Sequence, residues 1–218
     1  MTAPSGVFVH PAGLCESDQV GRGTRVWAFA HVLAGARIGA DCNICDHAYV
    51  ESGAVLGDRV TVKNAVLVFD RVTVGDDVFL GPNVVFTNDF RPRAHVRKGH
   101  DALLPTTVET GVTLGANVTV VCGVTIGAHA FVAAGTVVTR DVPAYALLVG
   151  NPGRRIGWAC RCGEALPADL TCSCGRAYRP DQAGLVLIEP AESVEPTAPA
   201  APLALHGAAP PTGDARVL

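Results

Sequence analysis

Two groups of residues in this sequence have types and spacings that could do chemistry. Asn88 and Asp89 stand where a regular apolar pattern ends, and Asp70 stands eighteen residues before Asn88. A carboxylate with an ordinary pKa near ~4 is a poor general base at neutral pH, but it accepts hydrogen bonds well. These residues therefore predict a site that holds a polar substrate group. Asp and Asn also tolerate the tight geometry of corners, so a purely structural role stays open.

The second group is the cysteine-rich segment CRCGEALPADLTCSCG, which contains two Cys-x-Cys-Gly motifs. Their thiols belong to Cys160, Cys162, Cys172 and Cys174. Four thiolates with short pairwise spacing resemble a structural zinc ribbon, and four Cys ligands leave no open position for water. We expect one structural zinc ion per chain. A reduced thiol cluster or a degenerate ribbon is the alternative, because the usual motif has two residues between its cysteines.

An apolar pattern with a period of six residues predicts the element that positions these groups. Every sixth residue from Val20 to Phe86 is large and apolar, and the series resumes from Val108 to Val138. A small or β-branched residue follows four positions after each member. Neither a helix nor an ordinary strand has this period. Three short sides per turn form a triangular prism, so we expect a parallel β-helix.

A longer period marks one corner of each turn. Glycine recurs every eighteen residues, at Gly21, Gly39, Gly57 and Gly75. We expect these glycines at corners because glycine adopts positive φ without steric cost. The hexads predict about six coils, and a strand spacing of ~4.8 Å gives a prism roughly 30 Å long. Residues eighteen apart stack in columns, so Asp70 and Asn88 should be neighbours on adjacent coils.

The regular pattern is interrupted from residue 88 to residue 107. This segment is rich in Arg, His and Pro and has neither the spacing nor the small residues of the coils. A loop of this length in a compact domain is usually functional or disordered. We expect an arm that folds over a neighbouring groove. The alternative is a solvated loop whose charges serve solubility.

The composition excludes several classes of protein. Of the 218 residues 49% are apolar and only 17% are charged, below the usual ~25%, so we expect much of the surface to be covered. The net charge of -3 gives no general basic field for nucleic acid. No apolar run approaches the ~20 residues of a membrane span. The N-terminus lacks a secretion signal. We therefore expect a cytoplasmic protein without nucleic-acid or membrane partners.

Three regions follow from these patterns. We expect a β-helix domain at residues 1–157, a zinc-ribbon-like element at 158–182 and a disordered tail at 190–218. The tail is rich in Ala and Pro and has no periodicity.

The segments VGDDVFLGPNVVFTND and VAAGTVVTRDVPAYALLVGNPGRRIG, with the Cys-Gly motifs, resemble the hexapeptide-repeat acyltransferases. Within that family the chain is most similar to N-acetyltransferases that act on UDP- or dTDP-linked 3-amino sugars. The resemblance covers about residues 7–180. It implies a left-handed β-helix, a homotrimer with active sites between subunits, and acetyl-CoA as the donor. It also implies a place in polysaccharide or glycosylated natural-product biosynthesis.

The resemblance implies roles for particular residues. An amino-sugar amine with a pKa not far from ~8 is partly unprotonated at neutral pH and requires no strong base. Asp70, Asn88 and Asp89 would then be the catalytic residues that hold the amine against the thioester. The substrate-binding residues would be Arg91, Arg93 and Lys63, with Arg97 and Lys98 also on the arm. The cofactor-binding residues would be Gly123, Ala133, Ala134, Arg140 and Arg154, with Arg155 beside them.

Other functions stay open at this point. His95 and His100 are five residues apart, like two zinc ligands of the carbonic anhydrases built on the same β-helix. A third His would be needed two coils upstream of His95, where the sequence has Arg59. An O-acetyltransferase and a non-catalytic β-helix scaffold are the further alternatives.

Overall fold

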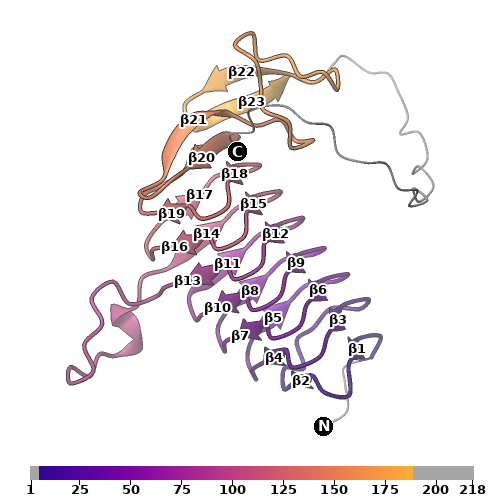
Figure 1. The fold of residues 1–218 in the computed structure, drawn as a ribbon. Coiled ribbons are helices and arrows are strands. Elements are labelled where there is room, and N and C mark those ends of the chain that lie inside the picture. The colour runs from indigo at the N-terminus through magenta and orange to yellow at the C-terminus, as the bar shows by residue number, and fades with distance from the viewer. Residues whose placement is uncertain (1–4, 189–218) are drawn as a thin grey trace, which may run out of the picture. The chain divides into compact units, whose positions relative to one another are not determined.

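A computed structural model describes residues 5–188, which form a parallel β-helix and a small cysteine-rich element (Figure 1). The predicted tail at 190–218 lies outside the described residues. Successive turns of the coil contribute short strands to three parallel sheets, called here sides A, B and C. Within residues 5–188, no helix has the length and apolar character needed to cross a membrane.

The strands of side A are β1 (Phe8–Val9), β3 (Arg25–Val26), β6 (Asn43–Ile44), β9 (Thr61–Val62), β12 (Phe79–Leu80), β15 (Thr113–Leu114), β18 (Phe131–Val132), β20 (Ala146–Val149) and the antiparallel β21 (Arg154–Trp158). Side B contains β2 (Leu14–Cys15), β4 (His31–Val32), β7 (Tyr49–Val50), β10 (Leu67–Val68), β13 (Val85–Phe86), β16 (Thr119–Val120) and β19 (Val137–Val138). Side C contains β5 (Arg37–Ile38), β8 (Val55–Leu56), β11 (Val72–Val74), β14 (Thr106–Val108) and β17 (Thr125–Ile126). The edges between sides are called AB, BC and CA.

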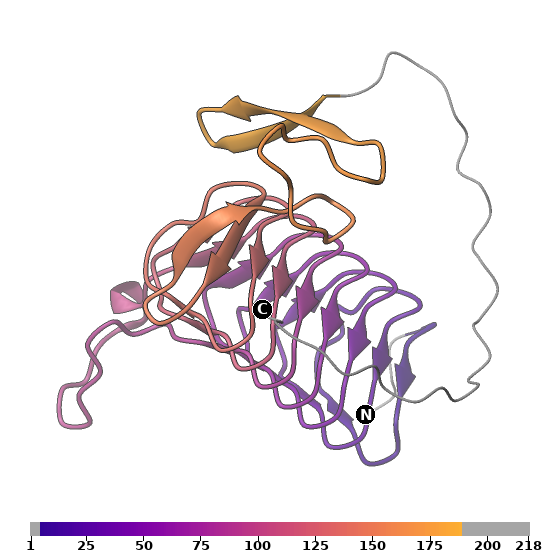
Figure 2. The ribbon, with the colours of Figure 1, turned by 45° about the horizontal axis from the view of Figure 1, so that its top comes forward.

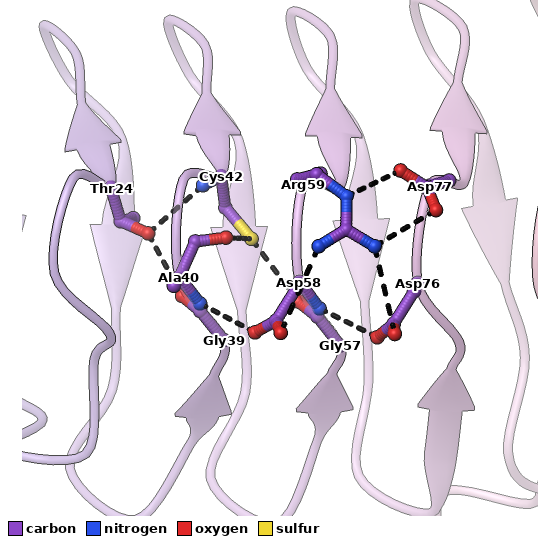
Figure 3. A network of polar contacts seen from close by, with 9 residues as sticks. All are labelled: Thr24, Gly39, Ala40, Cys42, Gly57, Asp58, Arg59, Asp76 and Asp77. Carbon is purple, nitrogen blue, oxygen red and sulfur yellow. Dashed lines mark hydrogen bonds and ion pairs between the residues drawn. The ribbon is translucent and has the colours of Figure 1, made fainter. Parts of the chain in front are cut away.

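The six-residue series forms the core of the prism, as the sequence predicts. All its members from Val20 to Phe86 and from Val108 to Val138 are buried, and Phe86 is the largest fully buried side chain. The small residues four positions later are buried as well, including Thr24 and Thr136. The Thr24 hydroxyl donates to the Gly39 carbonyl (2.9 Å), so this polar member of the core is hydrogen-bonded (Figure 3).

The coil makes about eight turns rather than the predicted six (Figure 2). Counting six-residue repeats misses the turns at the two ends of the coil, because these turns contain fewer than eighteen residues. Phe8 of β1 pairs with Arg25, and Phe131 of β18 pairs with Leu147, whereas interior pairs such as Arg25 with Asn43 are eighteen residues apart. A change in turn length shifts the phase of the pattern without ending the coil.

The glycines that recur every eighteen residues lie on edge CA, as corner residues should. The reason is not the positive φ that the sequence predicts. Gly39 and Gly57 do not adopt positive φ; that geometry belongs to Asp41 (φ 56) and Arg59 (φ 57), two residues later. A Cβ atom at Gly39 would lie 2.5 Å from the backbone of Gly57. Glycine is therefore required there because adjacent coils approach closely.

Carboxylates complete the hydrogen bonding of edge CA (Figure 3). Asp58 accepts the backbone N–H of Ala40, and Asp76 accepts that of Asp58, both at 2.8 Å. Arg59 binds both carboxylate oxygens of Asp77 at 2.7 and 2.9 Å, and this hydrogen bonding lowers the pKa of Asp77. Asp58 and Asp76 thus have a structural role, because each accepts a backbone N–H of the preceding coil.

Replacing Gly39 by alanine should lower the free energy of unfolding by about 3 kcal/mol, because backbone rather than a flexible side chain has to move. The midpoint of urea unfolding measures this change. Gly157→Ala is the matched control, since a Cβ atom there has nothing within 4 Å. Equal midpoints for the two variants would contradict the close-approach explanation.

The arm leaves the coil at edge BC, between β13 and β14, and contains the 3-10 helix η1 (His100–Ala102) (Figure 1). Neighbouring coils in the interior otherwise align residues 18 apart, as in the Arg59–Asp77 pair. Across the arm this spacing is 34, as in the hydrogen bond between Asn83 and Asn117. The coil therefore continues in register past the arm, which is an insertion into one turn.

The cysteine-rich element follows β21 and ends with the hairpin of β22 (Ala177–Asp181) and β23 (Gly184–Ile188). It extends past the expected boundary at residue 182, because β23 supplies the partner strand of β22. Its small core consists of Tyr145, Cys160, Cys172, Tyr178 and Leu185.

Candidate functional site

Edge BC gathers the polar residues that the sequence singled out. Asn88 lies on the coil next to Asp70, and its side-chain N–H₂ donates to the Asp70 carbonyl at 3.5 Å. On the next coil the Cys122 N–H donates to the hydroxyl of Thr87 at 3.0 Å. The pairing of β16 with β19 then places Arg140 beside Cys122. One edge therefore carries Asp70, Asn88, Cys122 and Arg140 in order.

The Asp70 carboxylate is held on both oxygens. Oδ1 accepts the backbone N–H of Arg71 at 2.7 Å, and Oδ2 lies 2.8 Å from Nε2 of His100 in η1. The backbone N–H of Asp70 donates to Glu51 at 2.8 Å. The Asp70 side chain is 19% exposed, so it faces solvent only in part. Each oxygen keeps a second lone pair that can accept a hydrogen bond from a ligand.

Asp89 is engaged within the arm instead. Lys98 Nζ contacts both carboxylate oxygens, with 2.8 Å to Oδ2, and also donates to the Arg91 carbonyl at 2.6 Å. The Arg91 N–H donates to Asp89 Oδ1 at 2.8 Å. The hydrogen bond from Lys98 is the main reason that the pKa of Asp89 is lowered. The geometry thus gives Asp89 the task of shaping the arm.

Two hollows involve residues of the arm. The first is an open hollow of about 600 Å³ within the arm. Its lining consists of Arg91, Pro92, Arg93, Val96 and Lys98. Its cationic lining suits an anionic ligand such as a phosphate. A second hollow of about 400 Å³ lies at the foot of the arm. Its lining is partly apolar and includes the predicted cofactor residues Gly123 and Arg140, together with Phe90, Leu104, Cys122, Val124, Thr139 and Asp141.

The other predicted binding residues lie elsewhere. Lys63 follows β9 and Ala133 and Ala134 follow β18, so all three are on edge AB, across side B from Asp70. Arg154 is exposed on β21, where its guanidinium donates to the Gly153 carbonyl at 3.4 Å. Within one chain the predicted residues therefore form two groups on opposite edges of side B.

Sequence reasoning missed Arg71 and Glu51, and it considered His100 only as a metal ligand. The sequence does mark Arg71, because it stands in a column of residues that are glycines in other turns. The corresponding corner residue of other turns is Gly35, Gly53 or Gly123, each with φ between 86° and 88°. Arg71 adopts the same left-handed region (φ 66). An arginine in a glycine position draws attention to its side chain.

The family model described as "Hexapeptide repeat of succinyl-transferase" matches residues 35–69 and 105–140. The chain is 46% identical over 175 residues to the dTDP-3-amino-3,6-dideoxy-alpha-D-galactopyranose 3-N-acetyltransferase of Aneurinibacillus thermoaerophilus, covering 79% of this chain and 90% of that protein. The chain belongs to the hexapeptide-repeat acyltransferases.

Two solved structures are also similar to this acyltransferase. PerB from Caulobacter crescentus, in complex with CoA and GDP-perosamine, is 23% identical with a TM-score of 0.44. The match covers 71% of this chain and spans only 56% of the PerB chain. A variant of AntD, an N-acyltransferase from Bacillus cereus in complex with dTDP and coenzyme A, is 18% identical with a TM-score of 0.45, covering 73% of this chain and 84% of that chain.

The acyltransferase brings its four late cysteines together. One sulfur from each lies within 4.8 Å of the others, with 3.5 Å between Cys160 and Cys174 and 3.6 Å between Cys162 and Cys172. Zn–S bonds of about 2.3 Å in a tetrahedron place sulfurs about 3.8 Å apart, so the four residues fit a zinc ion. The Tyr178 hydroxyl lies 3.1 Å from the Cys160 sulfur. The backbone N–H of Arg176 helps to lower the pKa of Cys174 to about 6, which favours a thiolate.

The structure does not support the carbonic-anhydrase alternative. Among residues 5–188 the Cys160–Cys174 cluster is the one converging group of three or more potential metal ligands. In His100, Nε2 contacts Asp70 and Nδ1 contacts Arg71. Arg59, at the position where a third His would be needed, forms an ion pair with Asp77 on edge CA. His95 and His100 therefore do not form a metal site with a third ligand.

Proposed function

We propose that this acyltransferase transfers an acetyl group from acetyl-CoA to the amine of a nucleotide-linked 3-amino sugar. The observation that carries the proposal is the 46% identity, over 79% of the chain, to an enzyme of that activity. That relative favours a dTDP-linked 3-amino-3,6-dideoxyhexose over a UDP-linked sugar. The order of polar residues along edge BC supplies a place for the amine next to a partly apolar hollow.

The chemistry asks little of the protein beyond orientation. The unprotonated amine nitrogen attacks the thioester carbonyl carbon, the C–S bond breaks, and the departing thiolate takes a proton from nitrogen. Asp70 and Asn88 hold the amine by hydrogen bonds against the thioester. Correct orientation of two reactants supplies several kcal/mol of the barrier. Asp89 supports this arrangement indirectly, because its ion pair with Lys98 stabilises the conformation of the arm.

The arm supplies the contacts to the nucleotide. Arg91 and Arg93 line the 600 Å³ hollow with Lys98, where a diphosphate would find several cationic donors. Gly123 and Arg140 line the hollow at the foot of the arm, which we assign to the coenzyme. Because CoA is anionic, Arg140 and Arg154 are suited to its phosphates.

The test is a direct assay with the purified full chain. The protein is mixed with acetyl-CoA and with dTDP- and UDP-linked 3-amino sugars, and thiol release and product mass are followed. We expect N-acetylation of a dTDP-linked 3-amino-3,6-dideoxyhexose. Thiol release only with sugars that carry a hydroxyl in place of the amine would identify an O-acetyltransferase. An absence of product with every sugar would contradict the proposal.

We further propose a homotrimer, with each active site shared by two subunits. Side B presents Tyr49, Leu67, Val85 and Val137 outward, and Leu14 is 45% exposed. Such a surface is stabilised when another subunit covers it. Contact between edge BC of one subunit and edge AB of the next would unite Asp70 with Lys63, Ala133 and Ala134. Sedimentation equilibrium should give three times 22.5 kDa, and a monomer mass would contradict the trimer.

We also propose that the enzyme works in the cytoplasm, where acetyl-CoA is available. A separate proposal is that the four cysteines bind one structural zinc ion. The converging sulfurs and the Cys-Gly turns support the metal. With Cys160, Cys162, Cys172 and Cys174 all used as ligands, the ion has no open position for substrate or water. Zinc therefore serves the fold of residues 158–188 and not the acetyl transfer.

A further inference from the structure

We infer that Arg71 and His100 are positioning residues that fix the Asp70 carboxylate in the acceptor site. The column pattern marks Arg71 only as an arginine in a glycine position, and its contact with His100 comes from the structure. The inference rests on the proposed function, since it assigns to Asp70 the task of holding the amine. It starts from a chain of three side chains that joins the coil to the arm.

The chain of contacts has a defined direction. An Nη2 atom of Arg71 lies 3.2 Å from Nδ1 of His100, and Nε2 of His100 lies 2.8 Å from Oδ2 of Asp70. A guanidinium can only donate, so Nδ1 accepts and the ring proton sits on Nε2. That proton points at Asp70. Arg71 therefore selects the tautomer with which His100 holds the carboxylate.

The second oxygen of Asp70 is fixed from the coil. Oδ1 accepts the backbone N–H of Arg71 at 2.7 Å, so Arg71 acts on both oxygens, once directly and once through His100. Arg71 also lies 3.7 Å from Asp101, the next residue of η1. The orientation of the carboxylate is thus set by one coil residue and one arm residue.

The backbone of Arg71 is compatible with glycine, which allows the side chain to be removed without strain. Its φ of 66° lies in the left-handed region, where a side chain costs of order 1–3 kcal/mol. Gly35, Gly53 and Gly123 adopt the same region at the corresponding corner without that cost. Eleven other non-glycine residues among those described share this region, Ala65 included, so what distinguishes Arg71 is the contact of its side chain with His100 of the arm.

Arg71→Gly separates positioning from folding. Glycine suits the left-handed backbone, so we expect an unchanged or higher Tm. We expect kcat/KM for the amino sugar to fall at least fivefold through kcat, with KM for acetyl-CoA unchanged. A stable Arg71→Gly enzyme with wild-type kcat/KM would overturn the inference.

His100 is tested by a pair of variants and a control. His100→Ala should lower kcat/KM at least fivefold, whereas His100→Gln, which keeps a donor near the Nε2 position, should stay within about twofold of wild type. His95→Ala, an exposed position on the same arm, should have no effect. Equal losses for the Ala and Gln variants of His100 would overturn the inference.

A double-mutant cycle shows whether both residues act through Asp70. In an Asp70→Asn background, Arg71→Gly and His100→Ala should cause less than a twofold further loss. Full additive losses would assign them a general role in arm structure and overturn the inference.

An NMR measurement tests the contact independently of activity. Two-dimensional ¹H–¹⁵N spectra of the imidazoles should show the Nε2–H tautomer for His100 and a mixture in Arg71→Gly. An Nδ1–H tautomer in the wild type would overturn the inference. If the wild-type enzyme acetylates no amino sugar but His100 has the expected tautomer, the proposed function fails and the contact stands.

Discussion

Asn88→Ala and Asp70→Asn should each lower kcat/KM for the amino sugar at least tenfold, or about 1.4 kcal/mol of transition-state stabilisation. Asn88 donates to the Asp70 carbonyl, and the Asp70 carboxylate is fixed on both oxygens. Removing either group loosens the site that orients the amine, and catalysis by orientation is sensitive to small displacements. Initial rates with saturating acetyl-CoA measure the effect.

The matched control for Asp70→Asn is Asp41→Asn, an exposed residue on edge CA with φ of 56°. Asn tolerates left-handed geometry, so this variant should keep wild-type activity. All variants should sediment like the wild type. If both edge-BC variants acetylate the true substrate at wild-type rates, Asp70 and Asn88 have only the structural role that corner residues often have.

Removing the metal should unfold the cysteine-rich element. Its core has only five buried residues, Tyr145, Cys160, Cys172, Tyr178 and Leu185, and two of them are among the four proposed zinc ligands. A core this small rarely supplies enough stability without a metal or a disulfide, and all eight cysteines are free. The purified protein should contain one zinc per chain. Chelation should raise the rate of protease cleavage within residues 158–188 at least tenfold.

Cys162→Ser tests the same ligand set by mutation. We expect loss of the zinc and the same protease sensitivity, because three thiolates hold the ion less tightly than four. Cys15→Ser is the control, since Cys15 lies in β2, far along the coil from the cluster. Stoichiometric zinc in a variant with all four late cysteines replaced would place the metal elsewhere. Unchanged protease resistance after chelation would show that the element folds without it.

The sequence by itself determined the coil and the neighbours within it. Because each turn repeats after eighteen residues, spacing along the chain fixes spacing in space, and every residue has known partners one turn away. The six-residue series therefore identified the core, and the same rule placed Asn88 beside Asp70. The Cys-x-Cys-Gly motifs likewise bring their thiols together, because tight turns and a short connection leave few other arrangements.

The tertiary structure decided the features that the repeat does not predict, which are the end turns, the reason for the corner glycines and the contacts of the arm. Two shortened end turns added coils that the six-residue count missed, and close approach of backbones, rather than positive φ, explained Gly39. The arm is aperiodic, so no spacing rule predicts its contacts. Its path in space directs Lys98 to Asp89 and His100 to Asp70. Side chains at the site thus depend on where an irregular segment returns to a regular one, and only the folded chain contains that information.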